Sequence, residues 1–494
     1  MRFCIRFGCV LALLALAGCT MMPAYHRPDS PVGEQWPAAT GMNAVHEGES
    51  QTAELAAWRE FVADPTVTRL VETALANNRN LRAALHNIEK VRAQYYIQRS
   101  GLLPAINAVG GSSGQYVNRH YSQTGSPVVQ HQYSANVGFT AFELDLFGRI
   151  RSLNESALQQ YLATEEAARS VQTALVGEVA SAYLNLTADR ELLSLARATY
   201  DNRKNLYEII RHKAEMGLSS QLEVNQAQTV MEEARVAAAT YEVRAAQGLN
   251  ALVFLLGAPV PEDVALADKL ADIKRFPDVK PGLPSDLLNR RPDIRSAEHA
   301  LMAMNANIGA ARANFFPSIS ITSSIGTLSP SFDKLFSSGT GSWMFQPQAV
   351  LPLFDTGRNI ARLRASKADR DMAVAVYEQA VQAAFREVAD ALAQRAVIEE
   401  QLAARRSLME ATQATCTLSN KRHEIGLDSF INVLDAQRGY FSAQQGYIGT
   451  LLLREANALN LYKTLGGGWD ELDIAALREA ERRGGERPAP EKAE

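Results

Sequence analysis

The sequence predicts a mixed α and β fold that is mostly α-helical and internally duplicated. Motifs in the first half recur in the second half at an offset of 209 to 213 residues. No proline occurs from residue 128 to 258 or from 353 to 487, which permits very long helices. Apolar and polar residues alternate over 133–141, the period of a half-buried strand.

The repeat relates two halves of the chain. A unit of this length is a duplicated half, since solenoid repeats span about 20–50 residues. The matched positions are Pro104 with Pro317, Gly148-Arg149 with Gly357-Arg358, Gly217 with Gly426, and Ser220 with Ser429.

Each half is expected to open with one helix, over residues 64–95 in the first half and 284–312 in the second. Pro104 and Pro317 mark the ends of these helices, because proline removes a helical donor. Two strands should then follow in each half, as two pairs.

The clearest strand is the alternating stretch 133–141. The first strand, within 105–117, has the weakest pattern, and Pro347 weakens the ladder of the last strand. Gly148-Arg149 and Gly357-Arg358 mark the junctions at which the strands give way to long helices.

The long helical runs are broken only at "EMGLSSQLE" and "EIGLDSF", which predicts two helix–turn–helix tips. Gly217 and Gly426 suit the left-handed position after a helix end. Ser220 begins the capping box "SQLE", and Asp428 or Ser429 should cap the equivalent helix. Each limb has about 65 residues, or roughly 100 Å of helix.

The N-terminus "MRFCIRFGCVLALLALAGCT" is typical of a signal peptide, because its apolar run is too short to span a bilayer. The end "LAGC" resembles a bacterial lipobox. That resemblance implies cleavage before Cys19 and a covalent lipid, such as palmitate, on this cysteine. The alternative is an ordinary signal peptide that contains a cysteine. Thr20 stands where an aspartate would suggest inner-membrane retention, so the outer membrane is favoured.

These signals give an expected organisation in sequence order. It comprises a lipoprotein signal peptide (1–18), a lipidated extended linker (19–65), a first repeat (66–257), a belt connector (258–283), a second repeat (284–467), and a C-terminal belt with a disordered tail (468–494).

Composition argues against several function classes. The net charge of −4 does not point to nucleic acid. Only Cys416 lies outside the first nineteen residues, so no disulfide framework or metal site is expected, and no cofactor besides the lipid. "GGSSG" formally fits G-x-S-x-G but lies in the weak strand, and no H-E-x-x-H or phosphate loop occurs. No catalytic residue is assigned, and an enzyme is not expected.

Four strands in one chain cannot span a membrane alone, because open edges would leave backbone groups unpaired in hydrocarbon. Common transmembrane barrels have about eight strands or more. Either the strands therefore lie in water, or several copies of the chain close one barrel together.

Several motifs together resemble one family. They are "PAYHRP" after the lipobox, "FELDLFGRIR", "NRRPDIRSAEHALMAMNANIGAARANFFPSISI", "LPLFDTGR" and "GLDSFINVLDAQR". The chain resembles the outer-membrane factors of TolC/OprM-type efflux channels over nearly all of its mature length. The resemblance implies a homotrimer with an α-helical periplasmic tube and a 12-stranded transmembrane β-barrel, four strands per chain. It also implies a protein in the cell outer membrane, lipid-anchored and extending into the periplasm.

The resemblance further implies a periplasmic gate at the second tip. Asp435 matches an acid that constricts similar channels, and Ile431 an apolar constriction one turn earlier. Asn432 occupies a place that is acidic in some relatives, so the number of acidic rings at the gate, one or two, is left undecided. Asp428 belongs to the same turn. For Asp435, the alternative is an exposed acid on a helix face.

His423 lies near the same tip and would make the gate pH-sensitive if it titrates there. A solvated or capping histidine is the alternative. Three Asp435 carboxylates around a narrow pore would repel one another and attract cations.

The function implied by the resemblance is passive conduction of drugs or other small toxic compounds to the exterior. The partners would be a periplasmic adaptor (a membrane fusion protein) and an inner-membrane transporter of the resistance–nodulation–division type. A type I protein secretion channel is the alternative. A periplasmic adaptor lipoprotein is a further rival, but one hairpin flanked by β-rich domains would be expected there.

Overall fold

The computed structural model describes residues 20–33, 36, 57–123, 125–279 and 287–467. The signal peptide, Cys19 and segment 468–494 lie outside these ranges. The elements in chain order are α2 (Trp58–Phe61), α3 (Pro65–Asn77), α4 (Arg79–Ser100), β1 (Asn107–Val117), β2 (Val128–Leu144), α5 (Arg149–Glu215), α6 (Gln221–Leu256), η1 (Leu270–Asp272), α7 (Leu287–Arg290), α8 (Pro292–Ala313), β3 (Ser318–Ser329), η3 (Phe332–Lys334), β4 (Gly341–Val350), α9 (Arg358–Glu424) and α10 (Phe430–Thr464).

The chain divides into two compact units, and each combines pieces of both halves. The first unit holds residues 1–29, 88–165 and 296–378, which include all four strands. The second unit holds residues 30–87, 166–295 and 379–494, which include both helical tips. Within the described helices, none has a stretch long and apolar enough to cross a membrane.

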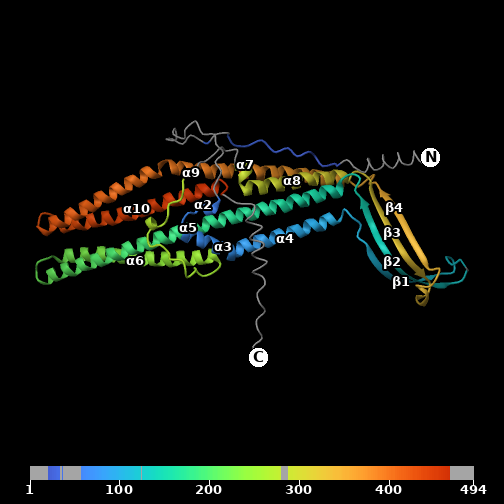
Figure 1. The fold of residues 1–494 in the computed structure, drawn as a ribbon, viewed down its shortest axis with the longest axis horizontal. Coiled ribbons are helices and arrows are strands. Elements are labelled where there is room, and N and C mark those ends of the chain that lie inside the picture. Colours follow the sequence, from blue (N-terminus) through green and yellow to red (C-terminus); the bar gives the residue numbers. More distant parts are fainter. Residues whose placement is uncertain (1–19, 34–35, 37–56, 124, 280–286, 468–494) are drawn as a thin grey trace, which may run out of the picture. The chain divides into compact units, whose positions relative to one another are not determined.

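The strands form one antiparallel sheet in the order β1-β2-β3-β4 (Figure 1). Both expected pairs are present, β1 with β2 and β3 with β4, and β2 of the first half additionally pairs with β3 of the second half. Pro347 lies in β4, an edge strand, where a missing backbone donor is tolerated. The sheet therefore joins the two halves and leaves β1 and β4 at its edges.

The alternation predicted through residue 141 breaks earlier than expected. The β2–β3 register shifts between Phe139 and Phe142, so β2 carries one extra residue there, a β-bulge. Ala141 takes a left-handed φ of 52°, and its N–H donates to the Thr322 hydroxyl at 3.0 Å. Because of the bulge, the Phe142 side chain lies on the same face of the sheet as the Phe139 side chain.

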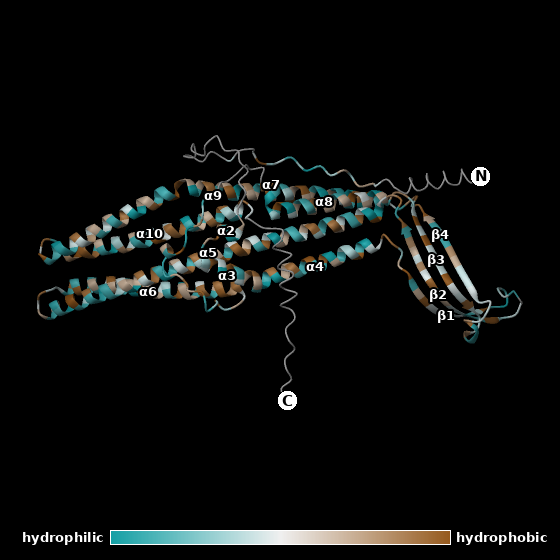
Figure 2. Ribbon diagram, viewed as in Figure 1, coloured by the Kyte–Doolittle hydropathy of each residue, from teal (hydrophilic) through white to brown (hydrophobic). Residues whose placement is uncertain are grey.

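The register sorts strand residues onto two faces, because direct partners project to the same side of a sheet. Figure 2 shows hydrophobic and hydrophilic residues mixed along the strands. One face is mainly apolar and carries Val137, Phe139, Ile321, Ile325, Trp343 and Phe345. The opposite face is mainly small and polar and carries Gln132, Ser134, Ser320, Thr322, Gln346 and Gln348. The sheet is thus amphipathic across β2, β3 and β4.

The long helices follow the prediction. α5 and α9 each have 67 residues, and each is followed by a return helix, α6 or α10 (Figure 1). Proline-free, Ala-rich sequence allows such lengths.

The expected opening helices are interrupted. The helix expected over 64–95 divides at Asn78, whose amide donates to the Leu255 carbonyl at 2.8 Å and whose oxygen accepts from Leu81 N. The helix expected over 284–312 divides at Arg291, just before Pro292, and residues 284–286 lie outside the described ranges. Asn78 and Arg291 are both recruited to tertiary contacts, which compete with helix continuation.

The core of the second unit lies where α2, α3, α5 and α10 meet the connector. Phe61 stacks on Tyr462 at 3.9 Å between ring centroids and on Phe276 at 5.5 Å. Asp64 caps α3 by accepting from Thr66 N at 2.9 Å, and its other oxygen accepts from Lys274 N at 3.0 Å. These contacts fix the connector onto the helices.

Candidate functional site

The two tips share one backbone turn. Gly217 and Gly426 take φ values of 74° and 76° after the ends of α5 and α9. Leu218 N donates to the Lys213 carbonyl and Leu427 N to the Arg422 carbonyl, each at 2.8 Å. This six-to-one bond is the Schellman motif, which favours glycine at the left-handed position. Both predicted turns are therefore present.

The caps after the turns differ. At the first tip, Ser220 Oγ accepts from Glu223 N at 3.2 Å, and the Glu223 carboxylate accepts from Ser220 N, which completes the predicted capping box. Ser429 takes the same N-cap position before α10, but its side chain makes no capping bond. Asp428 does not supply one either, because its carboxylate pairs with Arg422 at 2.9 Å. The predicted side-chain cap of α10 was therefore wrong.

The proposed gate residues lie on the first turns of α10. Asp435 is 66% exposed, and its nearest basic partner is Arg438 at 3.6 Å. Ile431 and Asn432 are also exposed. His423 Nδ1 donates to the Asp428 carbonyl at 3.0 Å, which matches the capping alternative. An exposed, weakly paired carboxylate here is free to face other charges.

A small apolar cluster joins the two hairpins next to these residues. It buries Ile210 of α5, Val224, Ala227 and Val230 of α6, and Phe430 and Leu434 of α10. Arg438 of α10 bridges to Glu233 of α6 at 3.3 Å, and Gln445 donates to the Tyr241 hydroxyl at 3.0 Å. The tips of the two halves are thus coupled within one chain.

A buried arginine lies beside this cluster, and the sequence analysis did not predict its role. Arg203 of α5 is 4% exposed, donates to the Val230 carbonyl at 2.8 Å and lies over the Phe441 ring at 5.5 Å. Burial lowers the pKa of its guanidinium. Glu233 lies one turn after Val230 and 3.9 Å from Arg203. This acidic residue was the signal in the sequence that could have indicated a partner for Arg203.

The junctions between strands and long helices lie in the first unit. Gly148 and Gly357 take φ values of 75° and 84°. Arg149 forms a two-pronged pair with Glu143, with one arm at 2.8 Å, whereas Arg358 is exposed. Pro104 and Pro317 lie between the preceding helices and strands β1 and β3. The sequence analysis missed the helix caps at these junctions, Asp145 and Asp355, which accept from Ile150 N and Asn359 N respectively.

The segment after Cys19 lies along α8 in the first unit. Its partners Glu298, Asn305 and Arg312 are spaced by seven residues and so share one side of the helix. The contacts are Arg312 with the Met21 carbonyl, Asn305 with the Pro23 carbonyl, and Glu298 with Tyr25 and Arg27. Burial beside Glu298 raises the pKa of Tyr25. Thr20 packs at Gly148, so the segment ends beside a strand–helix junction.

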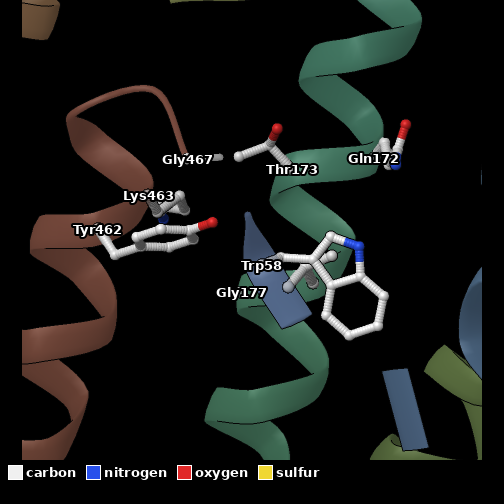
Figure 3. A pocket seen from close by; sticks show the side chains of 8 residues that line it. Trp58, Gln172, Thr173, Gly177, Tyr462, Lys463 and Gly467 are labelled. Atoms are coloured by element: carbon white, nitrogen blue, oxygen red, sulfur yellow. The ribbon is translucent and has the colours of Figure 1, made fainter. Parts of the chain in front are cut away.

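A pocket in the second unit is lined by apolar, hydroxyl and amide side chains and by one lysine, Lys463. Figure 3 shows Tyr462 and Lys463 of α10 across from Thr173 and Gly177 of α5, with Trp58 below. Its lining residues include no carboxylate, histidine or cysteine. Across the described ranges, no group of three or more His, Cys, Asp or Glu residues could hold a metal ion.

Comparison with known families gives a match over most of the chain. The model of the family described as outer membrane efflux protein matches residues 70–258 and 283–467. The two matched ranges correspond to the two halves recognised in the sequence.

Comparison with individual proteins gives the same family. The antibiotic efflux pump outer membrane protein ArpC and the toluene efflux pump outer membrane protein TtgC, both of Pseudomonas putida, are each 48% identical over 465 residues. Each alignment covers 94% of this chain and 96% of the relative. The open-state structure of the MtrE outer membrane channel of Neisseria gonorrhoeae superposes with a TM-score of 0.81 at 37% identity, covering 91% of this chain and 98% of MtrE.

Proposed function

The chain belongs to the outer membrane efflux protein family, and from this premise we propose that three copies form one gated channel for small toxic compounds. Such a protein is the outer-membrane component of an efflux pump and passes its cargo passively to the exterior. It has no enzymatic role.

The amphipathic, open sheet carries the proposal of a trimer. One face is mainly apolar along β2, β3 and β4 and the opposite face is mainly polar, and among the described residues the edge strands β1 and β4 each pair on one side only. Open edges are unfavourable in hydrocarbon, so a membrane-spanning wall must close on itself. Three copies would give twelve strands, with the apolar face toward lipid and the polar face toward water.

The mass of the purified protein in detergent tests this assembly. Native mass spectrometry should give three chains per particle, and planar bilayers should show discrete channel conductance. A monomer without conductance would overturn the proposal.

The cargo and partners follow from the relatives. ArpC and TtgC carry names that specify antibiotic and toluene efflux. We therefore favour drugs and solvents as cargo over proteins exported by a type I system. A periplasmic adaptor and an inner-membrane transporter, of the resistance–nodulation–division type, would deliver the cargo. Deleting the gene should raise susceptibility to antibiotics and toluene and leave protein secretion unchanged; the reverse result would favour protein export.

Asp435 is our candidate for an acidic ring at the periplasmic gate. Its exposure and its distance from Arg438 leave the carboxylate able to repel its copies and to hold cations. Asp435→Ala should raise single-channel conductance severalfold and weaken block by divalent cations, more so when combined with Ile431→Ala. Asp428, Asn432 and His423 would shape the same constriction.

The first tip offers a matched control. Gln226 occupies the position equivalent to Asp435, and Gln226→Ala should leave conductance and cation block close to the wild-type values. Equal conductance in wild type and Asp435→Ala would remove Asp435 from the gate.

Cys19 is our proposed lipid attachment site. The segment that follows it is held against α8 through the buried Glu298, and Thr20 lies beside Gly148. Cys19→Ser should abolish labelling with radioactive palmitate, whereas Cys416→Ser should retain it. Labelling that persists in Cys19→Ser would place the lipid elsewhere.

A further inference from the structure

A cavity lies at the junction where the strands give way to the long helices. It has a volume of about 320 Å³ and is found where β2 leads into α5 and β4 leads into α9 (Figure 1). All of its walls belong to the first unit. A cavity of this size admits a small organic molecule, since ligand pockets have about 300–1,000 Å³. The charged side chains in its lining are Glu143, Asp145, Arg149, Arg358 and Arg362.

The two acids in this lining are bound within the chain. The Glu143 carboxylate accepts from both arms of the Arg149 guanidinium, one of them at 2.8 Å. The Asp145 carboxylate accepts from Ile150 N at 3.1 Å and from Arg151 N at 2.8 Å. Each carboxylate in the lining thus has partners of its own, and one of the three arginines is neutralised.

The two arginines that α9 contributes are different. Arg358 and Arg362 are exposed, and within the described ranges neither guanidinium has a hydrogen bond or an ion pair. Because they are four residues apart on one helix, they project from the same side and their like charges repel. Planar guanidinium groups bind carboxylate, sulfonate and phosphate oxygens in a two-pronged geometry. The cavity therefore has an excess of positive charge suited to an acidic group.

The repeat shows that the first half closes the same position with an internal ion pair. The offset of 209 relates Arg358 to Arg149, and it relates Pro352 to Glu143. Pro352 lines the cavity as well. The second half therefore has the arginine of the first half without the carboxylate that binds it.

The second uncompensated arginine is also particular to the second half. The same offset relates Arg362 to Leu153, an apolar residue. The capping of the two helices is similar, since Asp145 and Asp355 both accept from backbone N–H groups at the helix starts. Positive charge near a helix N-terminus opposes the helix dipole, so the stability of α9 does not account for its two arginines.

An apolar surface lies beside the arginines. Phe147 and Phe316 line the same cavity, and their rings stack at 4.7 Å between centroids. Phe316 is 40% exposed, so part of this stack is available for contact. The cavity thus combines positive charge with aromatic surface, a combination that suits a molecule with one acidic group and an apolar body.

The position of the cavity on the sheet indicates what it meets. Three of the four strand residues in its lining lie on the polar face, because Glu143 pairs with Ser320, whereas Ser318 and Val350 follow the alternation of Ser320 and Gln348. The polar face is the one that the proposed channel turns toward water. The cavity would accordingly meet compounds in the passage.

We propose that this cavity binds amphiphilic anions, small compounds with one carboxylate, sulfonate or phosphate group and an apolar body, as they pass through the channel. Arg358 and Arg362 bind the acidic group, which takes the place that the Glu143 carboxylate has beside its arginine in the first half. The apolar body contacts the Phe147 and Phe316 rings. The inference rests on the proposed function and names a class of cargo for it.

Binding of 1-naphthoate, a carboxylate on two fused aromatic rings, tests the site in the full-length protein in a non-ionic detergent. Isothermal titration calorimetry, with detergent alone as the blank, should detect 1-naphthoate and not its neutral amide, 1-naphthamide. Arg362→Leu introduces the residue of the first half and should weaken the affinity about tenfold, the effect of losing a charge-assisted hydrogen bond. Arg364→Gln changes an exposed arginine of α9 outside the cavity and should leave the affinity unchanged.

A second variant tests the site with both arginines in place. Pro352→Glu introduces the carboxylate of the first half beside Arg358 and should abolish binding of 1-naphthoate, because the added acid competes for the same guanidinium groups. Pro352→Gln is the matched neutral change and should retain binding.

Equal binding of 1-naphthoate and 1-naphthamide would overturn the anion site, and so would equal 1-naphthoate affinity in wild type, Arg362→Leu and Pro352→Glu. Native mass spectrometry and bilayer conductance of the same preparations separate this failure from that of the proposed function. Trimers that conduct without binding 1-naphthoate would leave the channel standing and overturn the site. A non-conducting monomer that binds 1-naphthoate would overturn the channel, and with it the passage of such anions.

Discussion

The two tips show how one duplicated backbone can carry two different arrangements of charge. Both end a 67-residue helix in the same glycine turn. Glu223 and Gln226 on the first tip correspond to Asn432 and Asp435 on the second, so the acid has moved by three residues. Glu223 is bound by its own cap, whereas Asp435 is exposed.

This difference separates an acid that caps its own helix from an acid that is exposed. A carboxylate at the third position of a helix can return to the N-cap and satisfy a free backbone donor. One turn later it has no backbone donor to bind and remains available to solvent, cations or other subunits. The second tip therefore lacks the side-chain cap and carries an exposed carboxylate instead.

The limbs behind the tips differ as well. Arg203 of α5 is buried beneath Phe441 of α10, which couples the hairpins. Its equivalent on α9 is Thr412, which donates to the carbonyl of Leu408 in its own helix. The first limb thus provides the buried polar contact that holds the two tips together.

Removing Arg203 should therefore have the largest effect. Arg203→Ala leaves a cavity beside Phe441 and removes the bond to the Val230 carbonyl, at a cost of about 2–4 kcal/mol in the free energy of opening at the tips. Hydrogen exchange of the α6 and α10 amides in the purified protein measures that free energy.

Thr412→Ala is the matched variant, and it should change the same exchange by less than about 0.5 kcal/mol. Arg203→Met, which keeps most of the stem, should lie between the two. Equal effects of Arg203→Ala and Thr412→Ala would mean that the limbs are equivalent after all.

The caps should give the next largest difference. Ser220→Ala removes the oxygen that accepts from Glu223 N and should cost about 1 kcal/mol in protection of the first turn of α6. Ser429→Ala removes no capping bond and should leave the first turn of α10 unchanged. Hydrogen exchange of the two first turns reports both, and similar losses would show that Ser429 does cap in solution.

Local signals in the sequence predicted the helices and turns, because their determinants lie within a few residues. Proline-free runs gave α5 and α9, and glycine gave both tips. The cap of α10 failed because Asp428 found a competing partner in Arg422. A rule that considers only the residues around a helix start does not show which of two possible partners a side chain binds.

Features that depend on distant residues were missed. The bulge at Phe139 follows from the pairing of β2 with a strand nearly two hundred residues away. The docking of Arg27 on Glu298 and of Arg203 under Phe441 likewise joins residues far apart in the sequence. The gate assignment of Asp435 came from family resemblance and stays a prediction.

The smallest expected difference between the tips is their response to acid. Hydrogen bonds from the Ser219 hydroxyl and the Ser220 N–H lower the pKa of Glu223 in the folded state. A lowered pKa stabilises the cap above the unfolded value of about 4.3, and this contribution is lost as pH falls through the folded pKa. Exchange protection of the first turn of α6 should therefore weaken below about pH 4.3 in wild type and not in Glu223→Gln. The first turn of α10, where Asn432 takes the equivalent place, should show no such loss; an equal acid response at both tips would mean that the relocated acid at Asp435 also supports its helix.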